Sequence, residues 1–263
     1  WCADQLLIGG GQPRVDPGQG APIGFVAAAG AAALGAWAEG ALLLFLFSPA
    51  YFVFLSPVNV EILSNQNAAS ISLYNQSNES ADLQVRVFEW RQNAGQDQLI
   101  PTDEIVVSPP FLKLQPSDSY NLRVVRINPE PISGEKTYRI IIDELPKPID
   151  SRKAAQGVNV LLRSSLPVFV VNKDAITKLS WKIDVNQNTP SLNISNIGNR
   201  HALLNSLMLI DTTANKSYPI KVNTVNGYIL AEKSKSYSIS NFTYQPNHKY
   251  SVSLTVNGKK TTL

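Results

Sequence analysis

The sequence predicts an all-β protein with two β-sandwich domains, and three observations support this prediction. Short segments rich in β-branched and aromatic residues follow one another from residue 51 to the end of the chain, as is typical of strands. Clusters of Asn, Ser, Gly and Pro separate these segments and predict turns. No segment keeps the 3.6-residue hydrophobic period of an amphipathic helix.

The first series of predicted strands has the number and spacing of an immunoglobulin-like sandwich. In 83–87, apolar Leu and Val alternate with Gln and Arg, as expected of a strand with one buried face. We therefore expect an N-terminal domain over residues 51–171. Its seven predicted strands are 54–63, 69–76, 83–90, 105–114, 120–127, 137–145 and 158–171.

A second series of seven predicted strands follows and indicates a second sandwich over residues 172–263. The segments are 178–185, 191–196, 202–211, 217–222, 227–231, 236–241 and 250–256. The last is followed by Asn257-Gly258, a strong hairpin signal. Within the first domain, residues 146–156 form a long, polar, proline-containing loop between two strong strands. Such a loop is more often functional or mobile than packed.

Residues 1–50 have a different character, and we expect them to lie outside the folded domains. Residues 1–40 are rich in Gly, Ala and Pro, which predicts a non-structural extension. The apolar run 41–47 followed by Ser48-Pro49-Ala50 fits the h-region and cleavage site of a secretory signal peptide. The run is too short to span a membrane, so we expect export, cleavage after Ala50 and no membrane insertion of the mature chain. A buried strand or helix is the alternative for this run.

Composition argues against several classes of function. The net charge is +3 and the basic residues are scattered, which does not favour nucleic-acid binding. One cysteine and two histidines leave no disulfide framework and no Cys- or His-rich metal site. The adjacent acidic pairs Asp103-Glu104 and Asp143-Glu144 lie on predicted strands, so the two side chains of each pair point to opposite faces. With no nucleotide-binding or hydrolase motif present, we expect a non-enzymatic protein without cofactors.

Three stretches together resemble one family. They are YRIIIDELP at 138–146, VLLRSSLPVFV at 160–170 and NIGNRHA at 196–202. They are similar to strands and a turn of the PapD-like periplasmic chaperones of chaperone–usher pili, especially the archaic branch. The resemblance spans roughly residues 51–263. It implies a chaperone that binds pilin subunits in the periplasm, stabilises them by donor-strand complementation and delivers them to an outer-membrane usher.

In that family the last strand of the first domain is an edge strand that is lent to a pilin, which implies a donor strand at 157–171. Side chains two residues apart on a strand share a face. One apolar row would therefore fill the groove of the subunit: Val158, Val160, Leu162 and Leu166. The alternative is that this row packs the core of its own sandwich. The same edge is also able to pair with a second copy of the chain.

Relatives in this family also anchor the C-terminal carboxylate of the pilin with basic residues. The first predicted strand has no Lys or Arg, and the donor strand offers only Arg163. We therefore expect Arg163 to act as the anchor, with Arg86, Arg123 or Arg139 as partners. Each of these three is equally well explained as a solvated charge or a cross-strand ion pair.

Other interpretations of the chain stay open at this point. An immunoglobulin-like pilin, adhesin or other secreted surface module is the main alternative function. A pilin, however, would normally be one incomplete sandwich and not two. Trp90 and Trp181 are expected to pack in cores and not to bind a ligand, because aromatic side chains are readily buried.

Overall fold

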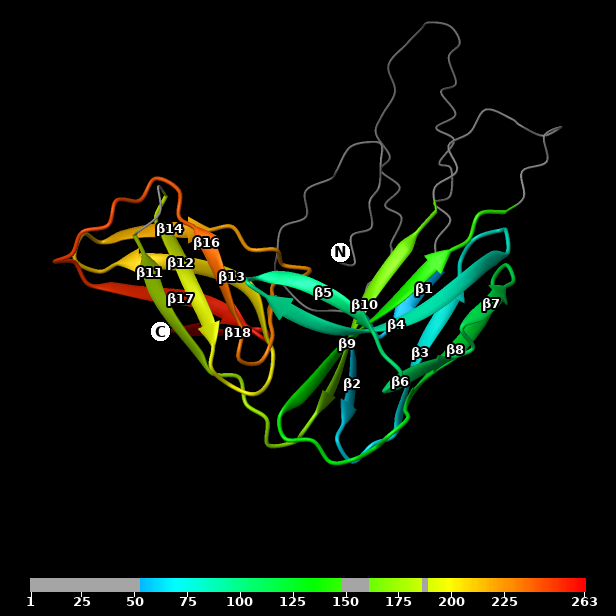
Figure 1. Cartoon of the computed structure of the whole chain (residues 1–263). Coiled ribbons are helices and arrows are strands. Elements are labelled where there is room, and N and C mark those ends of the chain that lie inside the picture. Colours follow the sequence, from blue (N-terminus) through cyan, green and yellow to red (C-terminus); the bar gives the residue numbers. More distant parts are fainter. Residues whose placement is uncertain (1–52, 148–160, 186–188) are drawn as a thin grey trace, which may run out of the picture. The chain divides into compact units, whose positions relative to one another are not determined.

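The computed structural model of the chain describes residues 53–147, 161–185 and 189–263. All of them lie in one compact unit of the chain. They form strands β1 to β18, arranged in four sheets that build two sandwiches (Figure 1). The prediction of an all-β protein with two sandwiches is confirmed. The expected extension and signal peptide, with the start of the donor strand at 157–160, lie outside the described residues.

The first sandwich consists of a four-stranded and a six-stranded sheet. The first sheet has the order β1 (Val53–Ser56), β3 (Ala68–Asn75), β8 (Ser119–Arg126) and β6 (Ile105–Ser108). The second has the order β2 (Val60–Leu63), β10 (Arg163–Val171), β9 (Glu135–Glu144), β4 (Ala81–Asn93) and β5 (Gln96–Pro101), with β7 (Phe111–Leu114) paired to β4. Between the two sheets lies a core in which Ile71, Leu122 and Ile140 are fully buried.

The second sandwich is built in the same way from a three-stranded and a five-stranded sheet. One has the order β11 (Leu179–Asp184), β12 (Ser191–Asn196) and β16 (Ser234–Ser238). The other has the order β14 (Lys216–Ile220), β13 (Ala202–Asp211), β17 (Tyr250–Val256) and β18 (Lys259–Thr262), with β15 (Tyr228–Ile229) paired to β13. Ile194, Leu209 and Val252 are fully buried between them.

Two segments expected to be single strands are each divided between the two sheets of the first sandwich. Residues 54–63 form β1 in one sheet and β2 in the other, and residues 105–114 form β6 and β7 in the same way. Both breaks fall at a Ser-Pro step, at Pro57 and Pro109. Proline has no N–H for the ladder and cannot continue a central strand. The strand β5 is a further element that the pattern did not predict.

The NIGNRHA stretch is a turn that ties the start of the second sandwich together. The buried Asn196 side chain donates to the carbonyl oxygens of Arg200, Ile229 and Leu230 and accepts from Gly198 N at 3.1 Å. A Cβ at Gly198 would lie 2.3 Å from the carbonyl oxygen of Ile176, so a larger residue does not fit there. Asn196 and Gly198 of this stretch therefore have a packing role in the second sandwich.

A third cluster of buried side chains joins the two sandwiches. Trp90 and Phe169 come from the first sandwich and Tyr228 from the second, and the centroids of the Trp90 and Tyr228 rings are 5.4 Å apart. The His201 ring stacks on Phe169 with 3.7 Å between centroids. Gln92 adds two hydrogen bonds to backbone groups at Tyr228 and Leu230. Trp90 is 1% exposed, so its expected packing role is confirmed, and Trp181 packs against the second core.

Candidate functional site

The second half of the expected donor strand forms β10, and one side of its first residues is open. β10 pairs with β9 along its whole length, from Arg163 to Val171. On its other side β2 pairs only with Val168–Val171. No other strand of the described chain pairs with residues 163–167 on that side. This segment is therefore a free strand edge next to the loop.

The ladder shows which backbone groups are available at this edge. Glu144 N donates to the carbonyl oxygen of Leu162 at 2.9 Å, so Leu162 faces β9. Because hydrogen-bonding directions alternate along an antiparallel strand, Leu161, Arg163 and Ser165 point their N–H and C=O groups away from β9. Pro167 has no N–H to offer where β2 begins to pair, as suits an edge strand. The edge thus offers successive donors and acceptors to another strand.

The apolar row of the expected donor strand divides into a part available at the surface and a part inside the core. Leu166 is 3% exposed and packs in the first core with Val168 and Val170. Its predicted place in a subunit groove therefore does not fit this structure, because its side chain already fills its own sandwich. Leu162 is half-buried, and Val158 and Val160 lie outside the described residues. Leu161 is 45% exposed, one residue from Leu162 along the strand.

Two of the four candidate arginines meet beside this edge. Arg86 on β4 and Arg163 on β10 bind the two carboxylate oxygens of Asp143 on β9, with 2.6 Å between Arg86 Nη2 and Asp143 Oδ2. The Arg163 side chain is 54% exposed and that of Asp143 only 12%. The three side chains line a cavity of about 430 Å³ together with Leu161 and Leu162. The group of three carries a net positive charge and faces solvent.

The other two candidates lie elsewhere. The buried Arg139 has its guanidinium 3.7 Å from the centroid of the Trp90 ring and hydrogen-bonded to Asn226 of the second sandwich. Its surroundings are those of a packing residue at the junction of the sandwiches. Arg123 is exposed on β8 in the other sheet, opposite Ser70 and Ser108. The structure therefore brings together Arg86 and Arg163, but not Arg139 or Arg123.

Asp143 is the member of this group that the sequence analysis missed. In the sequence, Asp143 stood out only as half of the acidic pair Asp143-Glu144, whose side chains point to opposite faces. No local pattern linked Asp143 to Arg163. The cross-strand register places these two residues opposite each other. Burial raises the pKa of Asp143, but hydrogen bonds and positive charge from Arg163 and Arg86 outweigh burial and keep the pKa below its usual value.

We expect Asp143 to stabilise the folded chain at neutral pH and to lose this contribution in acid. Because its pKa is lowered by folding, the unfolded chain takes up the proton first as pH falls. The contribution is complete well above the ordinary Asp pKa of about 4 and is lost as pH falls through the lowered value. Urea unfolding should show that Asp143→Asn costs about 1 kcal/mol near pH 7, since both arginines are about half exposed. An equal cost near pH 2 would contradict the assignment.

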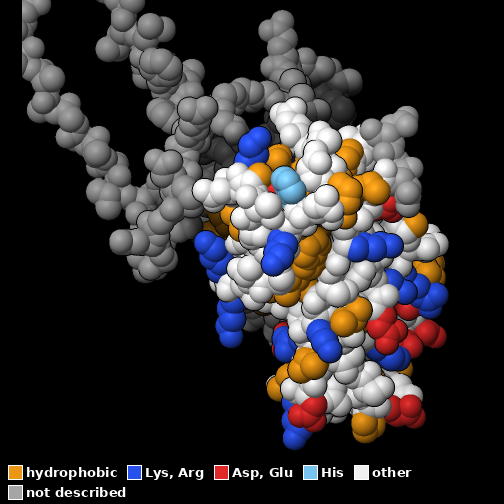
Figure 2. Space-filling view, turned by 90° about the vertical axis from the view of Figure 1, so that its left-hand side faces the viewer, with side chains coloured by type: hydrophobic (Ala, Val, Ile, Leu, Met, Phe, Trp, Pro, Cys, Tyr) orange, Lys and Arg blue, Asp and Glu red, His pale blue; other side chains and the backbone are white. Residues whose placement is uncertain are grey.

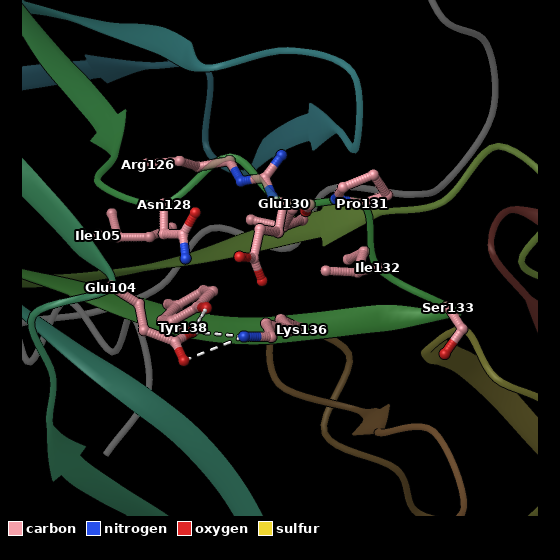
Figure 3. Close-up of a pocket in the computed structure, with 11 residues that line it drawn as sticks. Glu104, Ile105, Arg126, Asn128, Glu130, Pro131, Ile132, Ser133, Lys136 and Tyr138 are labelled. Carbon is pink, nitrogen blue, oxygen red and sulfur yellow. Dashed lines mark hydrogen bonds and ion pairs between the residues drawn. The ribbon is translucent and has the colours of Figure 1, made fainter.

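A separate polar pocket lies at another part of the first sandwich. Figure 3 shows Glu104, Tyr138 and Lys136 joined by hydrogen bonds on one side and Arg126 and Glu130 on the other. Burial and the neighbouring Glu104 carboxylate raise the pKa of Tyr138, so its hydroxyl stays protonated and donates. Lys136 pairs with Glu104, and Arg126 donates to the backbone carbonyl oxygens of Ser64 and Glu130, as in a structural network.

The described residues give no support to a metal centre or a membrane span. No cluster of three or more metal-ligating side chains occurs among them. None of their elements is a helix long and apolar enough to cross a bilayer.

An open strand edge is a feature that allows a protein to bind a polypeptide by strand pairing. Residues 53–173 match the family of pili and flagellar-assembly chaperones, PapD N-terminal domain. The first sandwich is therefore a domain of the PapD-like pilus-assembly chaperone family, and this match spans a little under half of the chain. No curated protein matches the sequence.

Solved structures share the fold of both sandwiches. One of them is a chain of the CsuC–CsuE chaperone–tip adhesion subunit complex from archaic Csu pili of Acinetobacter baumannii. It is 24% identical with a TM-score of 0.62, and the match covers 81% of this chain and 97% of that chain. A chain of the Salmonella enterica SafA pilin–SafB chaperone complex is 18% identical with a TM-score of 0.58, over 79% and 90%. The Pseudomonas aeruginosa CupB2 chaperone is 16% identical with a TM-score of 0.54, over 80% and 98%.

Proposed function

We propose that this chain captures pilin subunits in the periplasm by lending them its donor strand and then passes them to an outer-membrane usher. The free edge of β10 over residues 163–167 is the observation that supports this most directly. A subunit strand pairs there with the outward N–H and C=O groups. Export through a cleaved signal peptide ending at Ala50 brings the chain to this compartment.

In this proposal the apolar residues before β10 fill the groove of the subunit. Val158, Val160 and Leu162 share one face, and each contributes about 1.5–3 kcal/mol when fully buried. Leu166 remains in the core of the chaperone and holds the donor strand in place. Within one strand, the first apolar side chains of this row therefore contact the subunit, and the last one packs in the chaperone's own core.

Arg163 and Arg86 then anchor the C-terminal carboxylate of the subunit. Asp143 holds both guanidinium groups on the outer face of the sheet, next to the free edge. The pair of positive charges exceeds the single negative charge of Asp143, so a second carboxylate is attracted to this site. The same edge is open to a second copy of the chain when no subunit is bound.

Replacement of Arg163 by Ala should weaken subunit capture without unfolding the chaperone. A charge-assisted contact is worth about 1.5–3 kcal/mol, so the expected loss of affinity is about tenfold to a hundredfold. Capture is measured by co-purification with a co-expressed pilin subunit and by titration of the isolated components. Arg123→Ala, on the other sheet, is the matched control and should leave capture unchanged. Unfolding of the isolated Arg163→Ala variant would instead show a structural role for this residue.

A further inference from the structure

A second cavity is lined mainly by residues of the second sandwich, and Asn59 of the first sandwich also lines it. It has a volume of about 970 Å³ and shares no lining residue with the cavity beside Arg163. Lys259, Thr261 and Leu263 line it from β18 and its end, and residues 175–179 line it from the chain that leads into β11. The cavity is therefore a cleft between one edge of each sheet.

Both of these edges have unpaired sides. Within the described chain β11 pairs only with β12, and β18 pairs only with β17. Lys178 O accepts from Ile197 N at 2.7 Å, so the next residue, Leu179, points its backbone groups away from β12. Leu263 and Val252 exchange two hydrogen bonds, so Thr262 likewise points its backbone groups away from β17. Two open edges border one cleft.

The charge around this cleft is one-sided. Lys178, Arg200 and Lys259 line it, and no Asp or Glu does so among the described residues. Arg200 pairs with Glu61 at 2.6 Å, whereas no ion pair among the described residues includes Lys178 or Lys259. Residues 172–263 contain eleven basic residues (Lys and Arg) and four acidic residues (Asp and Glu). Residues 51–171 contain eleven basic and thirteen acidic residues, so the excess of positive charge lies in the second sandwich. Figure 2 shows one face of the molecule, on which Lys and Arg side chains, hydrophobic side chains and a group of Asp and Glu side chains all lie.

The shape and chemistry of the cleft select one kind of occupant. Open strand edges provide backbone groups that an extended peptide can pair with. Leu179, Leu203 and Leu263 provide apolar surface that a small inorganic anion would not use. A concave site also fits a single extended segment better than a lipid surface. The two lysines favour carboxylate side chains on that segment.

We propose that this cleft of the second sandwich binds an extended, acidic peptide segment of a partner protein by strand pairing. This cleft is a different site from the cavity beside Arg163, with which it shares no lining residue. The chaperone then has two strand-pairing sites of different chemistry, one for each sandwich.

The test uses a fluorescent peptide of about ten residues with alternating Glu and Val, a length that suits one strand. Fluorescence anisotropy with the full chain should show binding that weakens with salt, and a Lys–Val peptide should not bind. The double variant Lys178→Glu, Lys259→Glu should lose affinity about tenfold or more, because both charges then repel the peptide. Lys216→Glu, Lys249→Glu changes the charge of the same sandwich equally outside the cleft and should stay within about twofold.

Two further measurements separate this proposal from its alternatives. Hydrogen exchange at the amide of Thr262 should slow when the peptide binds, as expected of an added strand. Equal losses in both double variants would overturn the proposal in favour of unspecific charge attraction. Displacement of the peptide by anionic phospholipid vesicles, without protection of that amide, would overturn it in favour of a lipid site. Subunit capture should be unchanged in the cleft variant, so failure here is distinct from failure of the donor-strand proposal.

Discussion

Replacement of Leu162 by Glu should abolish the 1:1 complex with a pilin subunit, while the same replacement at Leu161 should leave the complex largely intact. Leu162 belongs to the row proposed to enter the subunit groove. Leu161, one residue away, points to the opposite face of the strand. A carboxylate in an apolar groove loses the burial gain of about 1.5–3 kcal/mol and adds a desolvation cost of several kcal/mol. Together these cost about 4 kcal/mol or more, which weakens affinity about a thousandfold and turns a micromolar complex into a millimolar one.

The measurement is co-purification from periplasmic extract, followed by size-exclusion chromatography of the complex. Both variants should fold, because neither leucine is part of the first core and Leu161 is 45% exposed. Circular dichroism and urea unfolding of the isolated variants check this. Normal capture by Leu162→Glu would show that the donor strand does not enter the subunit. Equal losses in the two variants would show that the contact does not depend on the face of the strand.

The alternation of residues predicted the sandwiches well, because burial on one face of a strand is a local property. For the expected donor strand, the alternation did not show which residues enter the chain's own core. Leu166 and Leu162 have the same parity and the same side chain, but only Leu166 belongs to the first core, just before β2 begins to pair with β10 at Val168. That pairing joins residues more than a hundred positions apart, so no pattern along the chain can show it.

The same reason explains why the sequence could not separate the candidate arginines from one another. Arg86, Arg139 and Arg163 all lie on strands of one sheet, and their sequence contexts look alike. The register places Arg163 opposite Asp143 but Arg139 opposite Pro167, beside the aromatic junction. The Ser-Pro steps, in contrast, carried a local signal. Proline cannot donate to a ladder, so the division of 54–63 and 105–114 could have been predicted from Pro57 and Pro109.

His201→Ala should destabilise the chain strongly, whereas Arg200→Ala, one residue earlier, should cost little. Glu135 on β9 has a fully buried carboxylate that accepts from the backbone N of His201 at 3.1 Å and lies 2.6 Å from His201 Nδ1. A carboxylate can only accept, so Nδ1 donates in this contact. Alanine removes that donor and the ring stacked on Phe169, and leaves the carboxylate short of a partner. Loss of one partner of a buried pair costs about 3–5 kcal/mol.

The adjacent ion pair provides the control. Arg200 and Glu61 also join the two sandwiches, but their side chains are 31% and 43% exposed, so this pair should contribute about 1 kcal/mol or less. Urea unfolding, followed by Trp fluorescence because Trp90 lies in the same junction, measures both variants. Similar small losses for the two would show that Glu135 finds another donor. A large loss for His201→Ala alone would place the main energetic link between the sandwiches at the buried carboxylate of Glu135. Glu135 begins β9, the strand that also carries Asp143 and pairs with β10.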